Sequence, residues 1–376
     1  MMRLRLSSRR PRAAASPVMA AAVVVSCAFF LCLLVGGAPA AAAAGGGKYP
    51  PVAKGLSFDF YKSSCPKAES IVREFLKKAI SKDVGLAAAL IRLHFHDCFV
   101  QGCDGSILLS KIRPGEDSEQ EAPPNTSLRP SAFKAVNDIR ALLHKACGLV
   151  VSCSDIVTLA ARDSVKLGGG PDYKVPLGRR DGLTFATRDK VLDALPPPTS
   201  HVPALVKALG KLNLDPTDLV ALSGAHTVGI AHCTSFDGRL FPQVDDTMDK
   251  WFASHLKLTA CPVANITTNT TVNDIRTPNT FDNKYYVDLL NRQGLFTSDQ
   301  DLFVNATTKP LVTKFAVDQS AFFDQFVYSI VKMGQIEVLT GSQGQIRANC
   351  SVRNPGAGLP WSAVETVVEA AESLVL

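Results

Sequence analysis

The chain has 376 residues, of which 46% are hydrophobic and 20% are charged, so it is long enough to bury a large core. Residues 1–55 carry seven Lys or Arg and no acid, whereas residues 56–353 carry a net charge of about +2. The formal charge of +6 therefore belongs mostly to the N-terminal leader. No basic patch argues for a nucleic-acid partner.

The leader has the residue order that is typical of a secretory signal. An Arg-rich start precedes an apolar run from about Val18 to Val35, and the small residues Ala38-Pro-Ala40 follow it. We interpret residues 1–44 as a cleaved signal peptide and residues 45–55 as a short lead-in. Because the apolar run is long for a signal core, an uncleaved membrane anchor is the alternative.

Residues 86–95 are strong helix formers without a breaker, and in a helix side chains four apart share a face. Arg92 and His96 should therefore point the same way with Phe95 beside them, while His94 points away. An imidazole beside a permanent cation suits proton transfer with stabilisation of the resulting anion. Read alone, such a pair could also be structural. A hydrolase metal held by both His94 and His96 is excluded by this geometry.

The loop after this helix carries hard oxygen ligands on a turn-rich backbone. Asp97, Asp104 and Ser106 follow at once, with Gly102 and Gly105 between them. Oxygen ligands on such a loop are typical of calcium sites.

Helical periodicity continues along the chain, and strand-like alternation is scarce. Apolar stripes predict helices within residues 71–80, 133–143, 154–162 and 321–330. Gly148 follows the second of these segments, and Gly168-Gly-Gly-Pro171 stops the third. The fold class is therefore mainly α.

A further helix is predicted to lead to His226. Asp215-Pro216 forms a good cap and first turn, and Leu219 and Leu222 share the face of His226. The small residues 223–225 should leave the approach to His226 uncrowded for a flat ligand. A neutral imidazole in such a place can bind a metal axially, although on its own such a histidine is more often a core residue.

Eight cysteines lie beyond the leader, and an even set behind a signal peptide indicates four disulfides. Their spacing does not suit zinc sites. Sequons at Asn265, Asn269 and Asn305 fit a secreted, glycosylated surface.

Two segments resemble the signatures of the secretory plant peroxidases (class III). The distal one is Leu93-His-Phe-His-Asp-Cys-Phe-Val-Gln-Gly-Cys-Asp-Gly-Ser106, and the proximal one is Asp218-Leu-Val-Ala-Leu-Ser-Gly-Ala-His-Thr-Val-Gly229. The likeness runs from about Phe58 to Arg353 in the family's order. It implies a haem peroxidase domain over residues 56–353, in which distal and proximal helical halves sandwich one haem b.

The resemblance assigns roles to the distal residues. His96 would accept a proton from hydrogen peroxide, Arg92 would stabilise the transition state, and Asn125 would hold His96, with Glu119 as the acid behind it. Two small phenolic donors would then each lose one electron, so that 2 phenolic donor + H2O2 gives 2 phenolic radical + 2 H2O.

On the proximal side, the resemblance makes His226 the axial haem ligand and Asp299 the carboxylate that supports it. Phe95 and Pro196 would bind substrate. Pro123 and Ser235 stand where some relatives carry aromatic groups near the haem edge.

The resemblance further implies two calcium sites and a disulfide pairing. The distal calcium set is Asp97, Val100, Gly102, Asp104, Ser106 and Glu119. The proximal set is Thr227, Asp274, Thr277, Thr280 and Asp282, for which a capped turn is the simpler reading. The implied disulfides are Cys65–Cys147, Cys98–Cys103, Cys153–Cys350 and Cys233–Cys261.

The biological setting is inferred from the family as well. It implies a monomeric, secreted enzyme of the apoplast or cell wall, without stable membrane insertion after signal cleavage, acting in lignin chemistry, peroxide removal and stress. Residues 354–376 can form an amphipathic helix or a solvated tail, and a vacuolar sorting role is the alternative address. A non-catalytic secreted calcium and wall-binding protein with this fold is the competing function.

Overall fold

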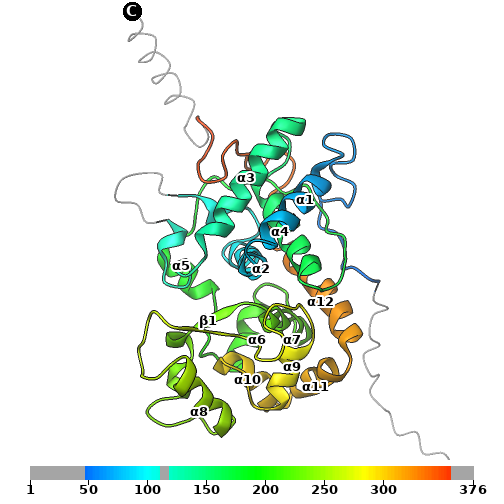
Figure 1. Ribbon diagram of the computed structural model, residues 1–376. Helices are drawn as coiled ribbons and strands as arrows, with labels where there is room; N and C mark the ends of the chain where they lie inside the picture. Colours follow the sequence, from blue (N-terminus) through cyan, green and yellow to red (C-terminus); the bar gives the residue numbers. More distant parts are fainter. Residues whose placement is uncertain (1–46, 111–117, 357–376) are drawn as a thin grey trace, which may run out of the picture. The chain divides into compact units, whose positions relative to one another are not determined.

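The computed structural model describes residues 47–110 and 118–356. The expected signal peptide and most of the C-terminal extension lie outside these residues. Twelve α-helices occur in the described part, and the prediction of a mainly α fold is confirmed (Figure 1). The helices are α1 (Ala68–Ile80), α2 (Gly85–Phe99), α3 (Pro130–Cys147), α4 (Cys153–Leu167), α5 (Arg188–Ala194), α6 (Val202–Gly210), α7 (Pro216–Ser223), α8 (Lys250–Thr259), α9 (Lys284–Leu290), α10 (Thr297–Val304), α11 (Lys309–Val317) and α12 (Gln319–Met333).

The described part of the chain contains one small sheet. Strand β1 (Ile230–His232) pairs antiparallel with β2 (Thr270–Val272), so that Ile230 lies opposite Val272. β1 comes four residues after His226 in the sequence, so the sheet fixes the chain just beyond this histidine.

Helices α1 to α4 pack together in the distal half, where α2 lies against α4 (Figure 1). The cause is the apolar stripe that each helix carries. In α1 the buried residues Val72, Leu76 and Ile80 recur every four positions, and each such side chain contributes about 1.5–3 kcal/mol on burial. The Ser152 hydroxyl caps α4 by accepting from the Asp155 amide at 3.1 Å. This packing fixes the helix that carries His96.

In the proximal half, α7 packs on α12, and α9 packs on α11. The start of α7 is a capping box: Asp215 accepts from the Asp218 amide at 2.9 Å, and the Asp218 carboxylate accepts from the Asp215 amide at 3.0 Å. Asp218 also pairs with Lys332 of α12 at 2.6 Å. The helix that leads to His226 is therefore fixed at its beginning, as Asp215-Pro216 predicts.

The end of α12 is tied to the distal half. The Cys103 amide donates to the Ile336 carbonyl at 3.0 Å. Arg179 donates to the Gly334 carbonyl at 2.8 Å and pairs with Asp155 at 2.8 Å, and both side chains of this pair are completely buried. Helix α12 thus contacts both halves and fixes their relative position.

All four disulfides have the expected pairing. They are Cys65–Cys147, Cys98–Cys103, Cys153–Cys350 and Cys233–Cys261. The Cys98–Cys103 bridge encloses the loop after α2, and the Cys233–Cys261 bridge joins the segment after β1 to the end of α8. A bridge of this kind typically stabilises a fold by about 2–4 kcal/mol.

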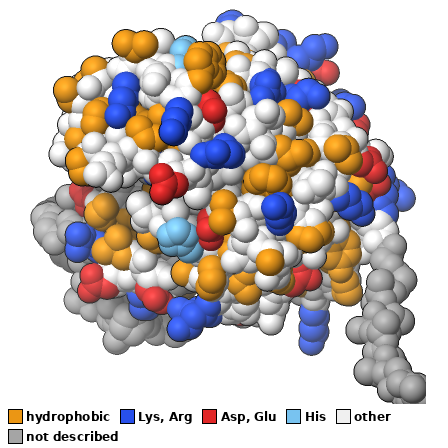
Figure 2. All heavy atoms as spheres, turned by 90° about the horizontal axis from the view of Figure 1, so that it is seen from below, with side chains coloured by type: hydrophobic (Ala, Val, Ile, Leu, Met, Phe, Trp, Pro, Cys, Tyr) orange, Lys and Arg blue, Asp and Glu red, His pale blue; other side chains and the backbone are white. Residues whose placement is uncertain are grey.

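The surface mixes side chains of all kinds. Figure 2 shows the molecule from the lower side of Figure 1, where hydrophobic, basic and acidic side chains are interspersed. Trp251, Leu258 and Val317 are among the exposed hydrophobic residues. No helix within residues 47–110 or 118–356 has the length and hydropathy needed to cross a bilayer.

Candidate functional site

Arg92 and His96 lie on one face of α2, as their spacing predicts. Arg92 Nε donates to His96 Nε2 at 3.1 Å, and the ring of Phe95 stands edge-on to that of His96 at 5.2 Å. His94 faces the opposite side, where Gly334 and Arg179 surround it. The two histidines of this motif therefore do not converge on one ligand.

The side chain of Asn125 fixes the tautomer of His96. Asn125 Oδ1 lies 2.6 Å from His96 Nδ1, and the amide nitrogen of Asn125 donates to the Glu119 main-chain carbonyl at 2.7 Å. The amide oxygen must therefore accept, Nδ1 carries the proton, and Nε2 keeps its lone pair. Burial and then the charge of Arg92 lower the pKa of His96 to about 3. His96 is consequently a neutral imidazole that can accept a proton at Nε2.

Arg92 is held by the loop that also carries Asn125. Its guanidinium donates to the Pro124 carbonyl at 2.9 Å, to the Ser127 carbonyl at 3.1 Å and to the Ser127 hydroxyl at 3.0 Å. One loop thus positions both members of the Arg92/His96 pair.

Glu119 plays a different part from the one expected. Its main-chain carbonyl, rather than its carboxylate, stands behind Asn125. The carboxylate accepts from the Ala186 amide at 2.6 Å, and burial raises its pKa to about 7. The sequence could not distinguish these roles, because Glu119 supplies both groups to the same region.

The expected distal calcium residues come together after α2. Three of their buried oxygens have no hydrogen-bond partner in the described part of the chain: Asp97 Oδ1, Ser106 Oγ and Glu119 Oε2. Burial and then the charge of Asp104 raise the pKa of Asp97 well above its usual value. Unpartnered buried oxygens are costly, and a calcium ion would satisfy them. The carbonyls of Val100 and Gly102 belong to the same loop.

The expected proximal calcium residues also converge. The Thr227 hydroxyl lies 3.0 Å from Asp274 Oδ2, 3.3 Å from Asp282 Oδ1 and 3.5 Å from the Thr280 carbonyl. The Thr277 hydroxyl lies 3.1 Å from the same Asp282 oxygen. Within residues 47–110 and 118–356 no group of three or more His, Cys, Asp or Glu side chains forms a metal cluster. Both candidate sites combine carboxylates with hydroxyls and carbonyls, which are ligands that calcium accepts.

His226 lies in the 3-10 turn Gly224–Thr227 that continues α7. Its Nδ1 is 2.7 Å from Asp299 Oδ1, and its side chain is 39% exposed whereas that of Asp299 is 5% exposed. Phe296 and Tyr285 stand edge-on to the imidazole at 5.4 and 6.0 Å. Because Nδ1 is engaged by the carboxylate, Nε2 is the nitrogen available to a metal.

The expectation that residues 223–225 all keep the cofactor side uncrowded is wrong for Gly224. A Cβ on Gly224 would lie 2.3 Å from the Tyr286 hydroxyl and 2.5 Å from the Phe322 ring. Gly224 is buried, so its small size serves the packing of α7 against the proximal core. Ser223 and Ala225 remain half-buried.

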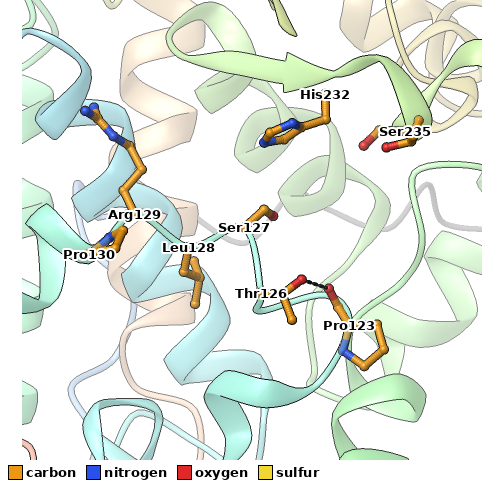
Figure 3. A pocket seen from close by; sticks show the side chains of 9 residues that line it. Pro123, Thr126, Ser127, Leu128, Arg129, Pro130, His232 and Ser235 are labelled. Atoms are coloured by element: carbon orange, nitrogen blue, oxygen red, sulfur yellow. Dashed lines mark hydrogen bonds between the residues drawn. The ribbon is translucent and has the colours of Figure 1, made fainter. Parts of the chain in front are cut away.

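A pocket of about 530 Å³ opens beside the loop that holds Arg92 and His96 (Figure 3). Pro123 and Ser127 of this loop face His232, the last residue of β1, and Ser235, which lies just after the strand. The lining residues are Pro123, Thr126, Ser127, Leu128, Arg129, Pro130, His232, Thr234 and Ser235. Pro123 and Ser235 thus line the same pocket.

Pro196 and Phe95, the expected substrate residues, are not among those that line the pocket. The sequence motifs do not predict Ser127 and His232 in the pocket, or Tyr285 beside Asp299. No motif marks these three residues, because they reach the site through contacts between distant segments.

Known proteins match most of the chain. The sequence model of the peroxidase family matches residues 72–318. Cationic peroxidase SPC4 of Sorghum bicolor is 65% identical over 328 residues, which cover 86% of this chain and 90% of the relative. Peroxidase 12 of Arabidopsis thaliana is 57% identical over 325 residues, covering 86% and 89%. Peroxidase 42 of Zea mays is 46% identical over 295 residues, covering 78% and 89%.

Proposed function

Since the chain belongs to the secretory plant peroxidases (class III) and is an enzyme that oxidises substrates with hydrogen peroxide, we propose that it uses haem b held by His226 to oxidise small phenols. The observation that carries this proposal is the bonding of the two histidines, each of which has Nδ1 engaged by a side-chain oxygen. His96 is neutral, and its unprotonated Nε2 accepts from Arg92, whereas His226 is bonded through Nδ1 to the carboxylate of Asp299.

Haem, when bound, supplies an iron that binds peroxide and stores oxidising equivalents. The residues fit such a group: Nε2 of His226 is available, Asp299 makes its imidazole more basic, and a basic axial ligand favours higher oxidation states. Asp299 is itself fixed by accepting from the Phe296 amide at 3.1 Å.

The distal residues would handle the protons and charge of peroxide cleavage. His96 Nε2 takes a proton from one peroxide oxygen and returns it to the departing oxygen, which leaves as water. Arg92, held by three hydrogen bonds to the loop that carries Asn125, stabilises the negative charge that develops as the O–O bond breaks. Asn125 keeps Nδ1 protonated throughout. Two phenols then each give up one electron and one proton, which completes the second water.

The pocket beside Pro123 and Ser235 is our candidate for the approach of these donors. Phe95 and Pro196 remain proposed substrate contacts on the family pattern. The small residues Pro123 and Ser235, where some relatives carry aromatic groups, leave this side open, and His232 and Ser127 add polar groups to it.

Two calcium ions are proposed to brace the two walls. The distal ion would use the unpartnered oxygens of Asp97, Ser106 and Glu119, together with Asp104 and the carbonyls of Val100 and Gly102. The proximal ion would use Thr227, Asp274, Thr277, Thr280 and Asp282. Asp97 adjoins His96 and Thr227 adjoins His226 in sequence, so each ion would fix the backbone of one histidine.

We further propose that the enzyme is a secreted monomer. Residues 1–44 would be removed as a signal peptide, 45–55 would lead into the domain at 56–353, and 354–376 would be the extension that decides between apoplast and vacuole. Fusing residues 354–376 to a secreted fluorescent reporter tests the address, since accumulation only outside the cell would reject vacuolar sorting.

The proposed function is tested on the purified full chain. A Soret band and peroxide-dependent oxidation of a small phenol are expected, and the His96→Ala variant should keep the band and lose the oxidation. A chain that lacks the band after expression with haem, and does not oxidise phenols, would instead be a non-catalytic protein that retains the fold.

A further inference from the structure

One oxygen of Asp299 receives two hydrogen-bond donors. His226 Nδ1 lies 2.7 Å from Asp299 Oδ1, and the Tyr285 hydroxyl donates to this same oxygen at 2.9 Å. The other oxygen, Oδ2, accepts from the Phe296 amide at 3.1 Å. The carboxylate that supports His226 is thus shared between the imidazole and a phenol.

Tyr285 is a permanent donor in this arrangement. Its side chain lies in α9 and is 2% exposed. The phenol hydroxyl carries a proton and the carboxylate oxygen of Asp299 can only accept, so the direction of this bond is fixed. The ring also stands edge-on to the His226 imidazole at 6.0 Å.

We propose that Tyr285 is a positioning residue that sets how strongly Asp299 attracts the Nδ1 proton of His226, and thereby the electron donation from His226 to haem iron. This inference rests on the proposed function, in which His226 is the axial ligand. Two donors on one oxygen share its negative charge, so each bond is weaker than it would be alone. Hydrogen bonding to an axial ligand is one of the ways by which a protein tunes a haem.

The neighbouring residue Tyr286 has a hydroxyl with a purely structural role. Tyr286 is fully buried in the same helix, but its hydroxyl donates to the Val220 carbonyl at 2.9 Å. Removing that hydroxyl costs a buried hydrogen bond without touching Asp299. Tyr286→Phe is therefore a matched control for Tyr285→Phe.

The experiment measures the Fe(III)/Fe(II) midpoint potential and the iron–histidine stretching frequency of the ferrous holoenzyme. In Tyr285→Phe the whole Oδ1 charge acts on His226, the imidazole becomes more anionic, and ferric iron is stabilised. The midpoint should fall and the stretching frequency should rise. Tyr286→Phe should keep both wild-type values while its melting temperature drops. No change in Tyr285→Phe, or the same change in both variants, would overturn the inference.

A second variant keeps the test open if Tyr285→Phe does not retain haem. Tyr285→3-fluorotyrosine preserves the shape but makes the phenol a stronger donor, so the midpoint should rise and the frequency should fall. A midpoint at or below that of the wild type would contradict the proposal. If the wild-type holoenzyme shows no iron–histidine band, the axial assignment of His226 fails instead, which separates the two failures.

Discussion

The two walls of the site use the same hydrogen bond with acceptors of different charge. On the distal wall His96 Nδ1 is 2.6 Å from the neutral amide oxygen of Asn125, and on the proximal wall His226 Nδ1 is 2.7 Å from the anionic Asp299. In both walls Nδ1 is bonded to a side-chain oxygen, and Nε2 is the nitrogen with the lone pair. In the proposed function, the group bonded to Nδ1, rather than the histidine itself, decides whether the imidazole takes a proton or binds a metal.

Physical chemistry explains why the acceptors are not interchangeable. A carboxylate beside His96 would stabilise imidazolium, and a protonated imidazole cannot accept a proton from peroxide. An amide beside His226 would leave the imidazole a weaker donor to iron. Burial and the charge of Arg92 reinforce the distal choice, because they lower the pKa of His96.

The largest effect should follow from removing the distal base. His96→Ala should slow the reaction with peroxide by about 10²–10⁴-fold, because a positioned acid–base group contributes about that much. Stopped-flow spectroscopy of the first spectral change after mixing with peroxide measures it. The exposed His144 provides the control, since His144→Ala should react at the wild-type rate. A wild-type rate in His96→Ala would exclude it as the base.

Replacing the amide acceptor of His96 by a carboxylate, the kind of acceptor that His226 has, should shift the pH profile of the peroxide reaction. In Asn125→Asp the new negative charge raises the pKa of His96 from about 3, by about 1–3 units for a close opposite charge. The base works only when it is unprotonated, so the acid-side loss of the peroxide reaction should move to higher pH by a similar amount. If a folded, haem-containing Asn125→Asp variant kept the wild-type pH profile, the group that accepts from His96 Nδ1 would not control the pKa of His96.

Calcium removal should affect both walls more mildly. Chelation should lower the melting temperature and the rate of phenol oxidation, since a ligand present at 100 times its dissociation constant stabilises by about 2.7 kcal/mol. Elemental analysis of desalted active enzyme should find two calcium ions per chain. Asp274→Asn should remove one of them. Full activity in enzyme that contains no calcium would refute both sites.

The smallest expected effect concerns glycosylation, which we expect to be absent from Asn125. Asn125 begins an Asn-Thr-Ser sequon, yet it is 2% exposed and its amide is bonded to His96 and Glu119. Peptide mapping should find Asn125 unmodified, whereas the exposed Asn265 is open to modification. Substantial glycan on Asn125 in active enzyme would overturn its role on the distal wall.

Much of this arrangement could be predicted from local sequence. The spacing of four between Arg92 and His96 gives their common face, the Asp215-Pro216 cap gives the helix to His226, and the apolar stripes give most helices. These features depend only on backbone periodicity and neighbouring residues. The partners Asn125 and Asp299 and the disulfide pairing needed the family resemblance, since long-range pairing is not encoded locally.

The remainder depended on three-dimensional packing. Gly224 faces Tyr286 and Phe322, which come from α9 and α12, so its role could not be read from α7 alone. Glu119 supplies a carbonyl to Asn125, and such main-chain contacts leave no mark on residue type. Tyr285 reaches Asp299 from another helix, and no sequence pattern distinguishes it from Tyr286.

The central claim is that His226, supported by Asp299, is the haem ligand opposite His96. The most direct measurement is the haem content and Soret band of purified His226→Ala, with and without added imidazole. We predict loss or displacement of the band in a chain with wild-type helical content, and its recovery when imidazole is added. A band and haem content identical to those of the wild-type enzyme, in the absence of imidazole, would contradict the account.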